Sequence, residues 1–236
     1  MRTPILTIMM LCLLAPPVAA MIHSPLALEA DPSKAEKPIA PLLEGLGDHH
    51  FPVTTQIAES QVFFDQGLRL TYAFNHSEAL RAFKEAARLD PDNAMAYWGW
   101  ALVLGPNLNL PMMPGVVPQA YDAIQQAVAR KGKVSERERA YIEALNKRYA
   151  SDPATDRAPL DRAYARAMKA LATRYPDDQD AATLYAAALM NLSPWDYWNL
   201  DGSPKGDTEE IINTLQSVVD RNPRHSGALH YYIHAV

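Results

Sequence analysis

The feature that most constrains the fold is a helical pattern that stops at a proline, in residues 63–93. This stretch reads FFDQGLRLTYAFNHSEALRAFKEAARLDPDN. Apolar side chains recur three and four residues apart in both halves, which predicts two amphipathic helices joined by a tight turn. Pro91 disfavours the helical conformation of Asp90, so the second helix ends there. Small Gly67 and Ala79 allow the two helices to approach closely, and Phe83 fills the gap to the next hairpin.

The helical pattern returns along the rest of the chain. A second hairpin begins at Ala94, and its second helix begins near Pro118, a first-turn position that tolerates proline. A third follows the capping box of Ser135 and Glu138, with helices over 136–149 and 159–174. A fourth begins at Asp180, and residues 227–236 open a fifth. Residues 105–115 and 191–206 are insertions, and no alternating strand pattern occurs, so we expect an all-α fold.

The spacing of the first hairpin resembles a tetratricopeptide repeat, except at Gln66, where a leucine is usual. The positions that carry the resemblance are Phe63, Gln66, Gly67, Leu70, Ala79, Phe83, Ala86 and Pro91. The phrases AMAYWGWALVLGPNLN and LHYYIHAV are similar to a group of exported bacterial tetratricopeptide-repeat proteins that are usually longer than this chain. The resemblance implies an α–α superhelix, a solenoid, over residues 49–236. Because the last repeat is incomplete, we expect the chain to be an N-terminal portion of a longer protein.

The first 48 residues do not match a repeat. Residues 1–20 have a basic Arg2, an apolar run over 5–14 and small residues at 18–20, which is typical of a secretory signal peptide. The run is too short to span a bilayer, so no stable membrane insertion is expected after cleavage. Residues 21–48 are rich in proline and predict a flexible leader. The expected location is therefore the bacterial periplasm or the exterior.

Composition and motifs narrow the function. The chain has 22 Lys and Arg against 27 Asp and Glu and no basic stripe, so nucleic acid is not an expected partner. Its one cysteine, Cys12, lies in the signal region, so any metal site must use histidines and carboxylates. No nucleophile elbow or glycine-rich phosphate loop is present, and we therefore expect a non-catalytic protein without a cofactor.

The resemblance implies a function as well as a fold. First helices of tetratricopeptide hairpins line a concave groove, and the leading hypothesis is a scaffold that binds a peptide or protein partner there. The basic clamp by which some family members hold a peptide carboxylate is missing. The groove residues implied by the resemblance are Phe64, Leu68, Trp98, Leu102, Thr183, Ala187, His230 and His234.

The alternative hypothesis is a metal- or cofactor-binding protein, or one domain of a metalloenzyme. His230 and His234 are four residues apart and share a helix face, a spacing suited to a transition metal such as zinc or copper. Such a site needs a third ligand. The pair at 49–50 is read as a solvated loop and His76 as a turn residue.

The second insertion carries a cluster of aromatic residues. Trp195, Tyr197 and Trp198 lie there with Asp196 and Asp201, and they would either cover the groove or bind a ligand, or else fix the loop to the array. We favour the second reading, in which Trp195 and Trp198 pack into the array.

Overall fold

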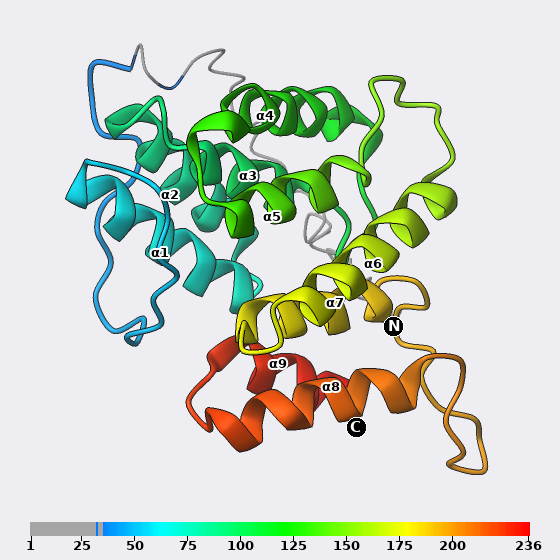
Figure 1. Cartoon of the computed structure of the whole chain (residues 1–236). Helices are drawn as coiled ribbons and strands as arrows, with labels where there is room; N and C mark the ends of the chain where they lie inside the picture. The colour runs from blue at the N-terminus through cyan, green and yellow to red at the C-terminus, as the bar shows by residue number, and fades with distance from the viewer. Residues whose placement is uncertain (1–31, 33–34) are drawn as a thin grey trace, which may run out of the picture. The chain divides into compact units, whose positions relative to one another are not determined.

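The computed structural model describes residue 32 and residues 35–236, so the expected signal peptide and the first part of the leader lie outside the described residues (Figure 1). The described part contains nine α-helices, two short 3₁₀ turns and no β-strand, which confirms the all-α fold class. The helices are α1 (Ala58–Tyr72), α2 (His76–Leu89), α3 (Ala94–Leu104), α4 (Val117–Arg130), α5 (Glu136–Asn146), α6 (Arg157–Arg174), α7 (Gln179–Met190), α8 (Thr208–Arg221) and α9 (Ser226–Ala235).

Each helix packs against the next one in the chain, from α1 with α2 through to α8 with α9. The first helices of successive hairpins also touch, as α1 does with α3, α3 with α5, and α7 with α9. In addition α9, drawn in red in Figure 1, packs against α1. The first and last helices of the described chain therefore belong to one packed unit.

The close approach of the first three helices depends on two glycines. Gly67 on α1 and Gly99 on α3 both face the ring of Phe83 on α2, and a Cβ on Gly67 would lie 2.7 Å from a ring carbon. Phe83 and Ala79 are fully buried. The predicted roles of Gly67 and Phe83 are thus confirmed, and Gly99 completes the contact from the next hairpin.

The first helices of the later hairpins begin with side-chain caps. Asn93 caps α3, Ser135 caps α5, Asp178 caps α7 and His225 caps α9, each by accepting a backbone N–H of the first turn. Ser135 and Glu138 form the predicted capping box. These capping residues place polar and ionisable side chains at the starts of neighbouring helices.

Residues 39–54, here called the N-terminal segment, are not helical but are held by side chains of the helices. Gln66 on α1 accepts the Leu43 N–H at 2.7 Å and donates to the Pro41 carbonyl at 3.0 Å. Glu85 on α2 accepts the Ile39 N–H at 2.8 Å. The polar residue that departs from the repeat pattern at position 66 therefore fastens a stretch for which the sequence predicts a flexible leader.

Further along the N-terminal segment, Phe51 is fully buried between the rings of Phe64, Trp98 and Tyr141. Asp65 on α1 accepts the Phe51 N–H at 3.0 Å, so the backbone is held as well as the ring. Glu138 on α5 accepts both the N–H and the hydroxyl of Thr54, each at 2.6 Å. The segment thus covers the adjoining faces of α1, α3 and α5. The Phe51 ring packs against all three helices, and backbone N–H groups of the segment bond to side chains of α1 and α5.

No helix in the residues that the structure describes combines the length and the apolar character that crossing a bilayer requires.

Gly99→Ala tests the helix contact at Phe83. Overpacking should lower the free energy of unfolding by about 1–3 kcal/mol, because the added methyl meets a buried ring that has no free space to move into. Gly132→Ala is the control, since nothing lies within 4 Å of its Cβ position and its backbone angle is ordinary. Urea unfolding of both variants measures the difference, and equal stabilities would contradict the packing described.

Candidate functional site

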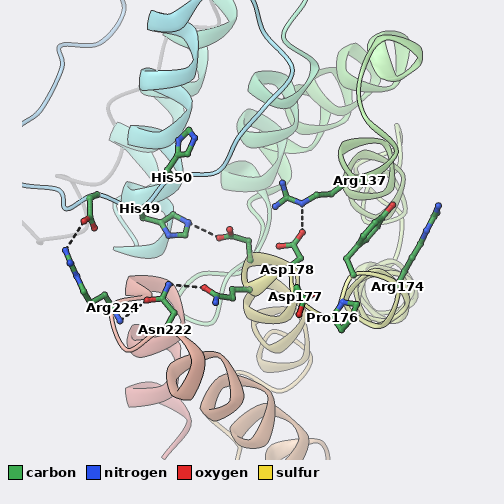
Figure 2. Close-up of a pocket in the computed structure, with 13 residues that line it drawn as sticks. His49, His50, Arg137, Arg174, Pro176, Asp177, Asp178, Asn222 and Arg224 are labelled. Carbon is green, nitrogen blue, oxygen red and sulfur yellow. Dashed lines mark hydrogen bonds and ion pairs between the residues drawn. The ribbon is translucent and has the colours of Figure 1, made fainter.

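A pocket of about 840 Å³ opens where the turns before α7 and α9 face the N-terminal segment (Figure 2). Four parts of the chain line it. They are residues 48–50 of the N-terminal segment, Arg137 on α5, residues 174–180 at the end of α6 and the start of α7, and residues 222 and 224 before α9. The lining is rich in charge of both signs.

Three arginines of this pocket form ion pairs of different exposure. Arg137 donates to Asp178 at 2.6 Å, and the Asp178 side chain is only 5% exposed. Arg224 donates to Asp48 at 2.8 Å, with both side chains more than three-quarters exposed. Arg174 donates to Glu136 at 2.8 Å on the rim, where both are also largely exposed. The pocket therefore has one fixed pair inside and two loosely held pairs at its edge.

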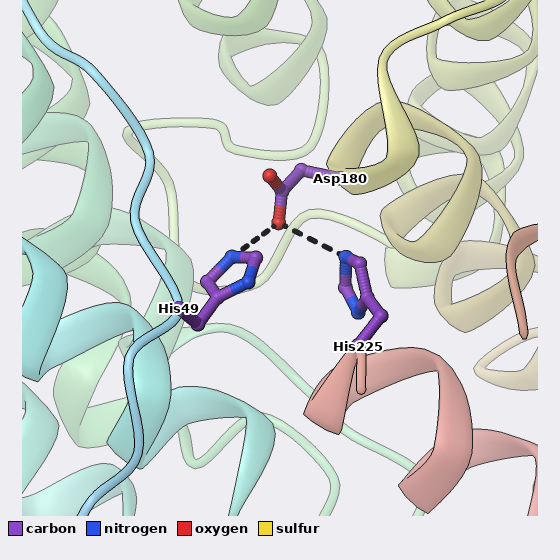
Figure 3. A group of neighbouring side chains, drawn as sticks. All are labelled: His49, Asp180 and His225. Atoms are coloured by element: carbon purple, nitrogen blue, oxygen red, sulfur yellow. Dashed lines mark hydrogen bonds and ion pairs between the residues drawn. The ribbon is translucent and has the colours of Figure 1, made fainter. Parts of the chain in front are cut away.

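The inner wall is organised around a single oxygen, Oδ1 of Asp180 on α7 (Figure 3). The Tyr72 hydroxyl donates to it at 2.6 Å and Nε2 of His49 at 2.9 Å. Nε2 of His225 lies 3.5 Å from the same oxygen. Because these groups come from α1, the N-terminal segment and the cap of α9, one carboxylate joins four parts of the chain.

The electrostatics of this cluster follow from its burial and its hydrogen bonds. Burial alone would raise the pKa of Asp180, but the nearby imidazoles of His225 and His49 outweigh it and hold the pKa well below the ordinary 3.8. Burial would lower the pKa of His49, and Asp180 outweighs that effect so that the pKa is raised above 6.5. Burial together with Asp180 raises the pKa of Tyr72.

His49, Asp180 and His225 bring one ligand atom each within 4.8 Å of one another, which is the spacing of a metal site. The hydrogen bond of His225 on its other side opposes that use. Nδ1 of His225 accepts the Ala228 N–H at 3.1 Å, so the ring proton is on Nε2. A metal on Nε2 would require the proton on Nδ1 and would break the cap of α9. The cluster therefore fits a structural hydrogen-bond network better than a metal centre.

Most of the residues expected to line a concave groove lie in the core. Six of them are at most 8% exposed: Phe64, Leu68, Trp98, Leu102, Thr183 and Ala187. Phe51 contacts Phe64 and Trp98 on the face where a partner was expected. In this structure these side chains contact the protein itself.

His230 and His234 are brought together as the helical spacing predicts. Their Nε2 atoms lie 3.1 Å apart, and both residues are half-buried. Burial and the neighbouring His230 lower the pKa of His234. Within the described residues, no group of three potential ligands includes this pair, so the structure places no third protein ligand beside it there.

The aromatic cluster of residues 191–206 differs from the expectation. Trp195 and Trp198 are 57% and 39% exposed, so the interpretation that both pack into the array is wrong. Tyr197 is the buried member at 4%, and its hydroxyl donates to the Met190 carbonyl at 3.2 Å. Trp198 does contact α9, because its Nε1 donates to the Ala235 carbonyl at 2.8 Å.

Of the pair at 49–50, one histidine matches its predicted surroundings and the other does not. His49 is not in a solvated loop, because its side chain is 13% exposed and bonded to Asp180. His50 is exposed, as expected, and bonds to Asp65. His76 begins α2 and bonds to Asn107 across the first insertion, and burial lowers its pKa to about 4.

Sequence reasoning missed Tyr72, Arg137, Asp180 and His225 as members of one site. A signal was present, since Asp178 and His225 both follow the prolines that end a preceding hairpin. Capping residues at equivalent positions of neighbouring first helices lie at the same end of those helices. The pairing of Arg137 with Asp178 and of Asp180 with Tyr72 depends on tertiary contacts that the spacing does not reveal.

The fold and the site together define an all-helical protein with a polar pocket at the starts of α7 and α9. Comparison of this chain with family models, with curated proteins and with solved structures found no match.

Asp180→Ala tests the central role of the carboxylate. It should lower the free energy of unfolding by about 3–5 kcal/mol, because the buried Tyr72 hydroxyl and the His49 ring lose their common acceptor and the buried His225 ring loses the carboxylate that it faces. Asp177→Ala is the matched control, an exposed aspartate of the same pocket. Chemical unfolding measures both variants, and a loss at Asp180 no larger than that at Asp177 would refute the assignment.

The pH dependence of stability tests the His49–Asp180 bond. The folded pKa of His49 is raised, so its contribution is complete below its unfolded value of 6.5 and is lost as the pH rises through the folded pKa. The Asp180 contribution has the opposite sign, since it is lost only as the pH falls below 3.8 toward the depressed folded pKa. The stability difference between wild type and His49→Gln should therefore shrink as the pH rises from 6.5 through the raised folded pKa of His49. A difference that grows with pH would contradict the bond.

Proposed function

We propose that this protein is a non-catalytic scaffold of tetratricopeptide-type hairpins that binds a peptide segment of a partner in the polar pocket. The observation that carries the proposal is the pocket itself. Its volume of about 840 Å³ is within the usual range for ligand sites, and it is lined by groups of both charges from four parts of the chain. The close packing of Gly67, Gly99 and Phe83 and the contacts between alternate helices support the superhelical arrangement.

The pocket is a better candidate than the concave face. The N-terminal segment already lies on α1, α3 and α5, with Phe51 fully buried and its backbone bonded to side chains of α1 and α5. A partner on that face would have to displace a buried aromatic ring. The pocket needs no such displacement, because its edge consists of exposed side chains.

The charges of the pocket suit a peptide. Exposed ion pairs contribute little to stability, so the Arg224–Asp48 and Arg174–Glu136 pairs can open and exchange for groups of a ligand. The guanidinium groups match a carboxylate in geometry, and exposed Asp177 offers an acceptor to an amine or a basic side chain. A peptide presents both kinds of group at short spacing.

The cluster around Asp180 supports a non-catalytic role. Its Oδ1 is already the acceptor of Tyr72 and His49 and faces His225, so the carboxylate serves to join segments. The N-terminal sequence supports export, which would place the partner in the periplasm or outside the cell.

The proposal is tested by binding to an immobilised peptide library with the double variant Arg174→Ala, Arg224→Ala. We expect the dissociation constants of captured peptides to rise about ten-fold or more, because two charge-assisted contacts are removed from the edge of the pocket. The control is Arg162→Ala, Arg166→Ala, which removes the same charge from exposed positions of α6 outside the pocket.

Two results would overturn this assignment. One is the absence of any saturable peptide binding by the wild-type protein. The other is binding that is unchanged in the pocket variant but is strengthened by Phe51→Ala. That second result would show that the ligand competes with the N-terminal segment for the concave face.

A further inference from the structure

His230 and His234 have the geometry of two ligands of one ion. Two imidazole nitrogens at ~2.0–2.1 Å from a metal lie ~2.9–3.4 Å apart when the angle at the metal is between square and tetrahedral. The two Nε2 atoms are 3.1 Å apart and share a hydrogen bond, so an ion bound to both replaces that bond, and the ring that donates it then carries its proton on Nδ1. The i, i+4 spacing on α9 holds both rings on the same face.

The hydrogen bond on the other side of His230 favours metal binding. Nδ1 of His230 lies 2.6 Å from the Tyr72 carbonyl oxygen, and only a ring N–H can donate to a carbonyl. The proton is therefore on Nδ1, and Nε2 has its lone pair directed toward His234. In metal proteins a ligand histidine commonly donates its other ring N–H to a carbonyl or carboxylate in the same way, and that bond orients the ring. The arrangement at His230 is the opposite of the arrangement at His225, where the acceptor role of Nδ1 leaves the proton on Nε2.

Two residues beside the His230–His234 pair have an unusual backbone conformation. Among the described residues, the non-glycine residues with positive φ are Phe74 at 56° and Trp195 at 62°. Their ring centroids lie 5.6 Å and 5.2 Å from that of His234. Residues held in this region cost conformational energy and tend to cluster at binding sites. Here two turns from distant parts of the chain place aromatic rings beside the same pair of imidazoles.

We propose that His230 and His234 bind one divalent ion of the late first-row transition metals, with water molecules in the remaining coordination positions. Affinity should follow the order of imidazole sites for these metals, with Cu²⁺ bound more tightly than Zn²⁺ or Ni²⁺. Two protein ligands make the site open, so an ion held there stays accessible from solution. The proposal is independent of peptide binding in the polar pocket.

The test uses Cu²⁺ alone, added to the full chain without an affinity tag. Equilibrium dialysis with elemental analysis should find one ion per chain, and the fluorescence of Trp195 should be quenched because its ring lies beside His234. His234→Ala should raise the Cu²⁺ dissociation constant about ten-fold or more, since each imidazole is one of only two protein ligands. Electron paramagnetic resonance of the wild-type complex should show coupling to two imidazole nitrogens.

Control variants separate this site from the other histidines. His50→Ala removes an exposed imidazole elsewhere, and His49→Ala removes the accessible member of the His49, Asp180 and His225 group, so neither should change Cu²⁺ affinity. His230→Ala should match His234→Ala, with thermal unfolding as a check that the chain is folded. The proposal is overturned if binding stays below half an ion per chain, or if His49→Ala weakens binding and His234→Ala does not.

Discussion

The structure depends on one buried carboxylate. Asp180 at the start of α7 accepts hydrogen bonds from Tyr72 at the end of α1 and from His49 of the N-terminal segment, and it faces His225 at the start of α9. A buried charge is costly unless it is surrounded by donors, so these segments must stay together for the charge to be tolerated. This requirement brings the first and last described helices into contact and fixes the inner wall of the polar pocket.

The N-terminal segment is the second constraint. Side chains of α1 and α5 bond its peptide groups, and its Phe51 fills the space between Phe64, Trp98 and Tyr141. The interaction has the form of a peptide held on a helical surface, but the peptide belongs to the same chain. The face of α1, α3 and α5 is thereby part of the core and is not available to a partner. The proposed partner site is instead the polar pocket at the turns before α7 and α9.

The two histidine clusters show how hydrogen bonds, and not proximity alone, decide what a group of ligand atoms can bind. His225 and His230 are five residues apart, the first as the N-cap of α9 and the second within that helix. One ring accepts a backbone N–H through Nδ1, and the other donates to a backbone carbonyl through the same atom. The proton is therefore on opposite nitrogens in the two rings. The first ring serves as a helix cap, and the second presents a lone pair.

The local structure follows from the amino-acid sequence alone. Apolar spacing and prolines placed the helices, as in the third hairpin, where 136–149 and 159–174 were expected and α5 and α6 span 136–146 and 157–174. The sequence also identified the capping box, the close approach at Gly67 and the facing pair on α9, because each depends on residues near in sequence. The tertiary structure alone brings groups from three other segments to Asp180, buries Tyr197 and not Trp195, and places Phe51 against Phe64 and Trp98. The contacts of Phe51 with Trp98 and of His49 with Asp180 join residues 47 and 131 positions apart, and helical periodicity carries no information at such separations.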